Sequence, residues 1–132
     1  MIVVDTSALI SVLAERPLIE PLRTRLVADD DLHAPYLVDV EILNSLRGLV
    51  ARGTISLDRA TDARADYANM LITRYPHQPL ADRIWELREN ISAYDAAFVA
   101  LAEALGCPLI TCDARLGRAA NHAAQIEVFS PA

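Results

Sequence analysis

The chain has 132 residues and a formal net charge of −6, so it is long enough for one hydrophobic core and too acidic simply to coat nucleic acid. Hydrophobic residues make up 53% of it, yet no stretch of about 18 to 20 uncharged apolar residues occurs, which excludes a membrane-spanning helix. All 12 basic residues are arginine, which excludes mechanisms that need a lysine ammonium and leaves phosphate recognition by guanidinium groups open.

Short β-branched strands alternate with amphipathic helices along the chain. The expected strands are residues 2–4, 32–34, 108–111 and 126–129, while residues 72–75 fit either a strand or the end of a helix. The expected helices are residues 8–15, 22–28, 35–52, 57–71, 79–89 and 93–105, with a short helix from residue 114. This alternation predicts a parallel sheet covered on both faces. We expect residues 1–132 to form a single α/β domain, a three-layer α/β/α sandwich around a mainly parallel sheet.

The cysteines and the N-terminus indicate the compartment. Cys107 and Cys112 lie near the two ends of one predicted strand, about 16 Å apart, which is too far for a mutual disulfide. The N-terminus carries Asp5 early and lacks a basic segment, which is unlike a secretory signal. We therefore expect a cytoplasmic protein with two unpaired thiols.

Four carboxylates lie at junctions between elements or on an apolar helix face. Asp5 and Asp113 each follow a predicted strand, and the carboxyl ends of parallel strands share one edge of a sheet. Asp95 lies in the first turn of helix 93–105. Glu41 lies in the apolar part of the long helix, one turn before Asn44. We expect these acids to converge.

Each acid also has a plain structural explanation. Asp5 and Asp113 are placed to cap the helices that follow them, with Thr6 or Ser7 as the other candidate for the first cap. Ser92 and Asp95 fit a capping box. Taken singly, three of these acids are better explained as caps and Glu41 as a partly exposed side chain; taken together, the four favour a binding site.

Four converging carboxylates predict a bound cation. Carboxylates within a few ångströms of one another repel, and most stay ionised only beside a positive charge. Oxygen donors suit Mg²⁺ or Mn²⁺. Zinc is disfavoured because the three histidines are scattered and neither cysteine has the spacing of a ligand.

Other families with an acid after the first strand do not fit. A receiver-type phosphoacceptor domain requires a lysine, which the chain lacks. A haloacid-dehalogenase-type phosphatase requires a second aspartate where Ser7 stands, and a metal-dependent adhesion site requires a serine where Leu9 stands. The glycine motifs of P-loop and dinucleotide-binding proteins are also absent, as is Gly-x-Ser-x-Gly.

The remaining pattern resembles the PIN-domain family of metal-dependent ribonucleases. The segments that carry the resemblance are VVDTSAL, VEILNSL, SAYDAAFVALA and LITCDARL, and they span essentially the whole chain in the family's order. The resemblance implies that Asp5, Asp95 and Asp113 bind Mg²⁺ or Mn²⁺, and that Glu41 binds it directly or through water. Some relatives carry a further acid where Gly117 and Arg118 follow, so one or two metals remain open.

The resemblance extends to the neighbours of the acids. Thr6, Ser7 and Thr111 match hydroxyl-bearing positions that orient the acids, and Asn44 lies one helical turn beyond Glu41. We expect RNA phosphates to be bound by arginines close to the acids in the sequence, and the candidates are Arg47, Arg52, Arg115 and Arg118.

The compact size looks most like the VapC toxins of bacterial toxin–antitoxin pairs. This implies an endoribonuclease in which a metal-activated water attacks a phosphodiester in line and leaves a 5′-phosphate and a 3′-hydroxyl. It also implies a homodimer that a VapB-type antitoxin inhibits. Two alternatives remain open: a housekeeping RNA-processing nuclease of the same fold, and a non-catalytic RNA- or partner-binding domain whose acids act as caps.

Overall fold

A parallel sheet forms the centre of the molecule. The computed structural model describes residues 1–131, so Ala132, the last residue of the predicted domain, lies outside the described residues. Within them, five strands pair in the order β3-β2-β1-β4-β5, and every pairing is parallel. The strands are β1 (Ile2–Val4), β2 (Leu32–Pro35), β3 (Ile72–Tyr75), β4 (Leu109–Thr111) and β5 (Ile126–Val128). The segment whose type the sequence left open, residues 72–75, is therefore a strand at one edge of the sheet.

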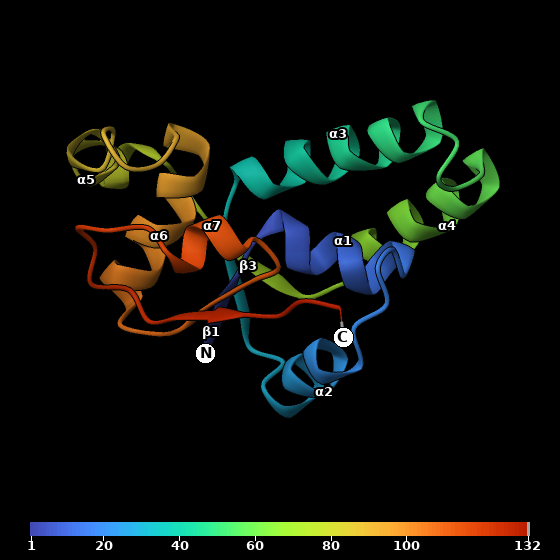
Figure 1. The fold of residues 1–132 in the computed structure, drawn as a ribbon, viewed down its shortest axis with the longest axis horizontal. Coiled ribbons are helices and arrows are strands. Elements are labelled where there is room, and N and C mark those ends of the chain that lie inside the picture. Colours follow the sequence, from blue (N-terminus) through green and yellow to red (C-terminus); the bar gives the residue numbers. More distant parts are fainter. Residues whose placement is uncertain (132) are drawn as a thin grey trace.

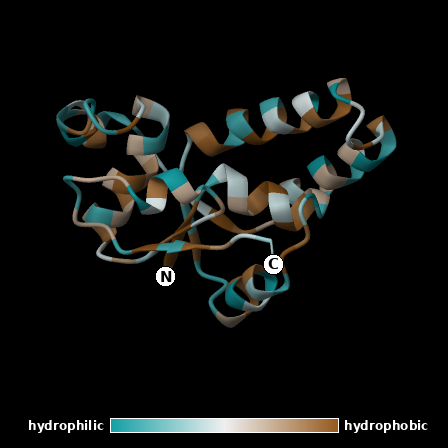
Figure 2. Cartoon of the chain, viewed as in Figure 1, coloured by the Kyte–Doolittle hydropathy of each residue, from teal (hydrophilic) through white to brown (hydrophobic). Residues whose placement is uncertain are grey.

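Burial follows the order of the strands. β1, β2 and β4 are buried along their whole length, because they pair on both sides and are covered above and below. The edge strands β3 and β5 are partly exposed and carry charged residues. Figure 2 shows hydrophobic residues along the strands and a mixture of hydrophobic and hydrophilic residues on the outer helices.

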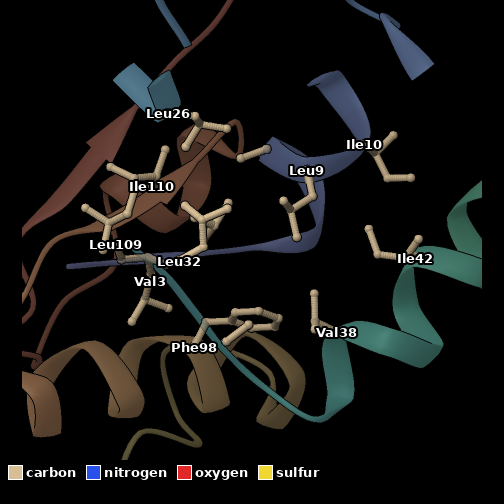
Figure 3. Close-up of a cluster of buried hydrophobic side chains, with 14 of the residues drawn as sticks. Val3, Leu9, Ile10, Leu26, Leu32, Val38, Ile42, Phe98, Leu109 and Ile110 are labelled. Atoms are coloured by element: carbon tan, nitrogen blue, oxygen red, sulfur yellow. The ribbon is translucent and has the colours of Figure 1, made fainter. Parts of the chain in front are cut away.

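Helices cover both faces of this sheet. The helices are α1 (Thr6–Ala14), α2 (Glu20–Ala28), α3 (Leu37–Ala51), α4 (Leu57–Ala68), the 3₁₀ turn η1 (Gln78–Leu80), α5 (Ala81–Glu86), α6 (Ala93–Leu105) and α7 (Ala114–Gly117). Phe98 of α6 packs beside Val3 on one face, whereas Leu9 of α1 and Leu26 of α2 lie on the other face (Figure 3). The predicted three-layer α/β/α architecture is confirmed.

α3 and α4 form a helical hairpin that extends away from the sheet (Figure 1). α3 starts just after β2, so its first turns lie at the carboxyl edge of the sheet and its last turns lie beyond it. α1 packs between this hairpin and the sheet. The N-termini of α1, α3 and α6 therefore gather at the same edge of the sheet, where the predicted acids are expected.

Several element boundaries differ from those predicted. Pro35 does not open the third helix: it is the last residue of β2 and is paired with Tyr75, and α3 begins at Leu37. Helix 57–71 ends at Ala68, and helix 79–89 is a 3₁₀ turn followed by one short α-helix. By contrast, the helix predicted at 93–105 has those bounds, with Ser92 as its N-cap.

None of the helices in residues 1–131 combines the length and the apolar character that crossing a membrane requires.

Candidate active site

The four predicted acids line one hollow at the carboxyl edge of the sheet. The hollow has a volume of about 260 Å³. It is lined by Asp5, Thr6, Ser7, Glu41, Asn44, Ser45, Asp95, Phe98 and Asp113. Residues from the ends of β1 and β4 thus meet residues from the first half of α3 and the first turns of α6. The expected convergence of the acids is what the parallel topology produces.

Asp5 is buried and also caps α1. Its Oδ1 accepts hydrogen bonds from the Ser7 hydroxyl at 2.7 Å and the Ala8 amide at 3.0 Å, and its Oδ2 accepts one from the Thr111 hydroxyl. Burial raises the pKa of Asp5, and these hydrogen bonds oppose the rise only in part. The expectation that Thr6 or Ser7 caps this helix is wrong, because both are already helical and Asp5 is the N-cap.

Ser7 and Thr111 connect the ends of β1 and β4. The Ser7 hydroxyl accepts a hydrogen bond from the Cys112 amide at 2.9 Å while it donates to Asp5. The Thr111 hydroxyl accepts one from the Asp113 amide at 2.9 Å. These two hydroxyls therefore fix the backbone that carries Asp113 relative to the carboxylate of Asp5.

Glu41 reaches the hollow from α3. Its Oε1 accepts a hydrogen bond from the Thr6 hydroxyl at 2.7 Å, so Thr6 holds Glu41 just as Ser7 and Thr111 hold Asp5. Burial raises the pKa of Glu41, and the charges of Asp95 and Asp5 add to the rise. Asn44 lies exposed, one turn further along the same helix.

Asp95 enters from the first turn of α6. The Ser92 hydroxyl caps this helix by accepting a hydrogen bond from the Asp95 amide at 3.2 Å, and the Asp95 side chain lines the hollow. Burial raises the pKa of Asp95, and the neighbouring charge of Asp113 raises it further. Three of the four acids thus retain a proton more readily than a free carboxylate does.

Asp113 is the exception, because it has a cationic partner. Arg115 donates to both of its oxygens, from Nη2 to Oδ2 at 2.7 Å and from Nε to Oδ1 at 3.2 Å. The Arg115 amide also donates to Oδ1 at 2.9 Å, so Asp113 caps α7 as well. These bonds to Arg115 lower the pKa of Asp113. Asp5 and Asp113 therefore serve as caps and line the hollow at the same time.

The donor atoms around the hollow suit a hard divalent cation, although their positions are not those of a closed ligand shell. As they are placed in residues 1–131, no three Asp, Glu, His or Cys side chains stand close enough to hold a metal ion. Hydroxyl groups donate to both oxygens of Asp5 and to Oε1 of Glu41, and Arg115 donates to both oxygens of Asp113. The donor set is four carboxylates, which fits Mg²⁺ or Mn²⁺ rather than zinc.

The four arginines predicted to bind RNA lie in different surroundings. Arg47 and Arg52 line a second hollow that adjoins the acids along α3. Arg115 is paired with Asp113. Arg118 is exposed at the end of α7 and lines neither of these hollows.

Two residues of the hollow were missed by the sequence analysis. Ser45 follows Glu41 by four residues and Phe98 follows Asp95 by three, so each lies on the same helix face as its acid. That spacing was a usable signal. Phe98 is almost fully buried and forms the apolar floor between α6 and the sheet (Figure 3).

Comparisons with known proteins agree with this fold and identify the family. The family model described as the PIN domain matches residues 2–122. Ribonuclease VapC9 of Mycobacterium tuberculosis is 45% identical over 116 residues, which are 88% of this chain and 88% of the relative. The chain therefore belongs to the PIN-domain family, among the VapC ribonucleases.

Solved structures of low sequence identity share the fold. PAE2754 from Pyrobaculum aerophilum has a TM-score of 0.69 and 21% identity, covering 96% of this chain and 83% of its own. VapBC2 from Rickettsia felis, bound to a DNA fragment from its promoter, has a TM-score of 0.65 and 16% identity, covering 98% and 99%. These proteins thus share the architecture of this chain although few of their residues are identical to it.

Proposed function

We propose that this protein, as a single PIN domain over residues 1–132, is a Mg²⁺- or Mn²⁺-dependent endoribonuclease that acts as the toxin of a toxin–antitoxin pair. The observation that carries the proposal is the hollow, where three acids of raised pKa and Asp113 meet at the carboxyl ends of parallel strands. The similarity to VapC9, a named ribonuclease, supports the same activity.

The proposed roles follow from the contacts of each residue. Asp5, Asp95 and Asp113 would hold the metal, with Glu41 as a further direct or water-mediated ligand. When bound, such an ion would lower the pKa of a water molecule and stabilise the leaving oxygen of the phosphodiester. Thr6, Ser7 and Thr111 orient the acids through the hydrogen bonds described above. The acids themselves are ligands, not nucleophiles.

The test is cleavage of end-labelled structured RNAs by the purified chain with Mg²⁺, with Mn²⁺ and with EDTA, beside the Asp5→Asn variant. We expect cleavage that needs both the metal and Asp5, with 5′-phosphate and 3′-hydroxyl ends. A product with a 2′,3′-cyclic phosphate, formed in EDTA, would contradict the proposal. The toxin role predicts growth arrest on expression that the product of an adjacent gene relieves.

We also propose a VapB-type antitoxin as partner, a homodimer and a cytoplasmic location. The fold shared with VapBC2 supports the partner, as does an apolar groove between α3 and α4 that Leu43, Val50 and Leu57 help to line. Cys107 and Cys112 are both unpaired, in keeping with a reducing compartment. Co-purification of a tagged copy with the adjacent gene product, followed by light scattering with and without it, tests partner and dimer.

A further inference from the structure

A second hollow continues from the acidic one along α3. It has a volume of about 470 Å³, and Asn44 and Ser45 line both hollows. Beyond these two residues it is lined by Arg47, Gly48 and Leu49 of α3, by the C-cap residue Arg52 and by Ile10 of α1. The two hollows therefore form one surface channel, acidic at one end and basic at the other.

The helix spacing explains why the two ends are continuous. Glu41, Ser45, Gly48 and Arg52 follow one another at intervals of four, three and four residues, so they lie along a single stripe of α3. At 1.5 Å per residue, Arg52 lies about 16 Å from Glu41 along the helix axis. A polynucleotide strand crosses such a distance within a few nucleotides.

The basic end of this channel carries cations without acidic partners. In the part of the chain that the structure describes, neither Arg47 nor Arg52 forms an ion pair, and no carboxylate lines this second hollow. The other acid-facing arginine, Arg115, is already paired with Asp113. Arg47 and Arg52 are thus the cations next to the acids that remain available to an anion.

Gly48 lets Arg52 lie against the helix. A Cβ atom at Gly48 would stand 2.9 Å from Nη1 of Arg52, so an alanine there would push the guanidinium aside. Glycine inside a helix is unfavourable relative to alanine. The absence of a side chain at this position leaves room for a guanidinium that faces the channel.

We propose that the channel along α3 is a subsite for RNA phosphates adjacent to the bond that is cut, with Arg52 and Arg47 as the groups that bind them. This inference rests on the proposed nuclease function, because it takes the acidic hollow as the place of cleavage. Guanidinium groups bind phosphate through paired N–H donors, and the Asn44 amide and Ser45 hydroxyl add polar groups between the arginines and the acids.

The experiment measures binding of a fluorescein-labelled single-stranded RNA as a function of salt. The Asp95→Asn background keeps the RNA intact. We expect Arg52→Ala to lower the salt slope by about 0.7, which corresponds to an affinity loss of about fivefold at 0.1 M salt. Arg47→Ala should act in the same way. Arg23→Ala, which removes the same charge from an exposed position on α2 that lines neither hollow, should leave both values unchanged.

Gly48→Ala separates RNA binding from stability. Alanine should raise the thermal unfolding midpoint, because it favours the helix, and should weaken RNA binding, because it displaces the Arg52 guanidinium. Three results would overturn the inference: Arg52→Ala and Arg47→Ala variants with the parent's salt slope, a parent that binds no RNA, or polyglutamate that competes as well as RNA of equal charge.

A parallel cleavage assay on the parent distinguishes this inference from the proposed function. If the parent cleaves RNA but the arginine variants bind it normally, the subsite is wrong and the nuclease stands. If RNA binding depends on Arg52 and Arg47 but the parent cleaves no RNA in Mg²⁺ or Mn²⁺, the arginines bind RNA phosphates but not beside a bond that is cut, and the proposed nuclease function is the part that fails.

Discussion

Carboxylates in two regions of this molecule have opposite surroundings. Away from the hollow, acids are tied to arginines. Glu103 on α6 accepts two bonds from Arg83 of α5, at 2.8 and 3.0 Å. Asp39 on α3 accepts a bifurcated bond from Nε of Arg74 on β3, at 2.9 Å to each carboxylate oxygen. In the hollow, acids face other acids and hydroxyl groups. The pKa of Glu103 is lowered by its pair, whereas burial raises the pKa of Asp95.

The difference separates charges that hold the fold from charges that are available for binding. A paired acid favours the folded chain, since its ionised form is stabilised there. A buried acid without a cationic partner destabilises the folded chain, because its ionised form is less stable there than in the unfolded chain. Although the chain has 12 arginines, three such acids line one hollow, where a bound divalent cation would offset this destabilisation.

The largest expected effect comes from removing a hollow acid. We expect Asp113→Asn to reduce RNA cleavage roughly 100-fold or more, because a metal ligand contributes several kcal/mol to transition-state stabilisation. Initial rates on one labelled RNA measure this. Retention of the parent's rate would remove Asp113 from the site.

Removing a paired acid should lower the stability of the fold and leave RNA cleavage unchanged. Among the residues that the structure describes, Glu103→Gln leaves Arg83 with Glu86 as its one acidic partner. It also weakens the bond that Glu103 accepts from the Ala123 amide. We expect the free energy of unfolding to fall by about 2 kcal/mol, the usual size for hydrogen bonds to a charged group. Urea titration measures this. If the variant instead kept the parent's stability and lost cleavage, the division into two regions would fail.

Arg115 pairs with an acid that lines the hollow, so within residues 1–131 the hollow contains one paired acid, Asp113, beside three acids without a cationic partner. Removing Arg115 should make Asp113 resemble the other three. The Arg115 guanidinium competes with a cation for the oxygens of Asp113. We expect Arg115→Ala to bind Mn²⁺ about two- to fivefold more tightly, a modest change because the pair is exposed. Paramagnetic resonance of free Mn²⁺ measures the affinity, with Arg118→Ala as the control for loss of charge. Weaker Mn²⁺ binding by Arg115→Ala would contradict this role.

The smallest expected effect is a change in how the stability of the fold depends on pH. Because the folded pKa of Glu41 is raised, its stabilising contribution is complete below its ordinary pKa of 4.5 and is lost as the pH rises through the folded value. The Glu41→Gln variant should therefore lose less stability than the parent as the pH rises above 4.5. Urea titrations without divalent metal test this. If the free energy of unfolding fell more steeply with pH in the variant than in the parent, the pKa of Glu41 would be lowered in the folded chain and not raised.

The sequence predicted the features that depend on local chemistry and chain order. The bounds of α6 follow from Ser92 at its start and from Gly106, whose positive φ of 65° suits glycine, at its end. The meeting of Asp5 with Asp113 follows from parallel strands, because their carboxyl ends share an edge. Neither result needed knowledge of side-chain positions.

Features that depend on tertiary contacts could not be predicted as well from the sequence. Pro35 favours a helix start by type, but pairing of β2 with β3 places it in the sheet. The bond from Arg115 to Asp113 depends on the side-chain geometry of a four-residue helix. The channel along α3 depends on how α1 lies beside that helix, although the stripe from Glu41 to Arg52 was visible as a spacing.

The most direct test of the central claim, that the hollow holds unpaired acids for a cation, is thermal unfolding of the parent and Asp95→Asn during a Mn²⁺ titration. Without metal, the variant should unfold at the higher temperature, because it lacks a buried charge that burial and Asp113 disfavour. Added Mn²⁺ should raise the midpoint of the parent well above that of the variant, because a ligand that binds the native state stabilises it. A variant that is less stable without metal and gains the same Mn²⁺ shift as the parent would contradict the account.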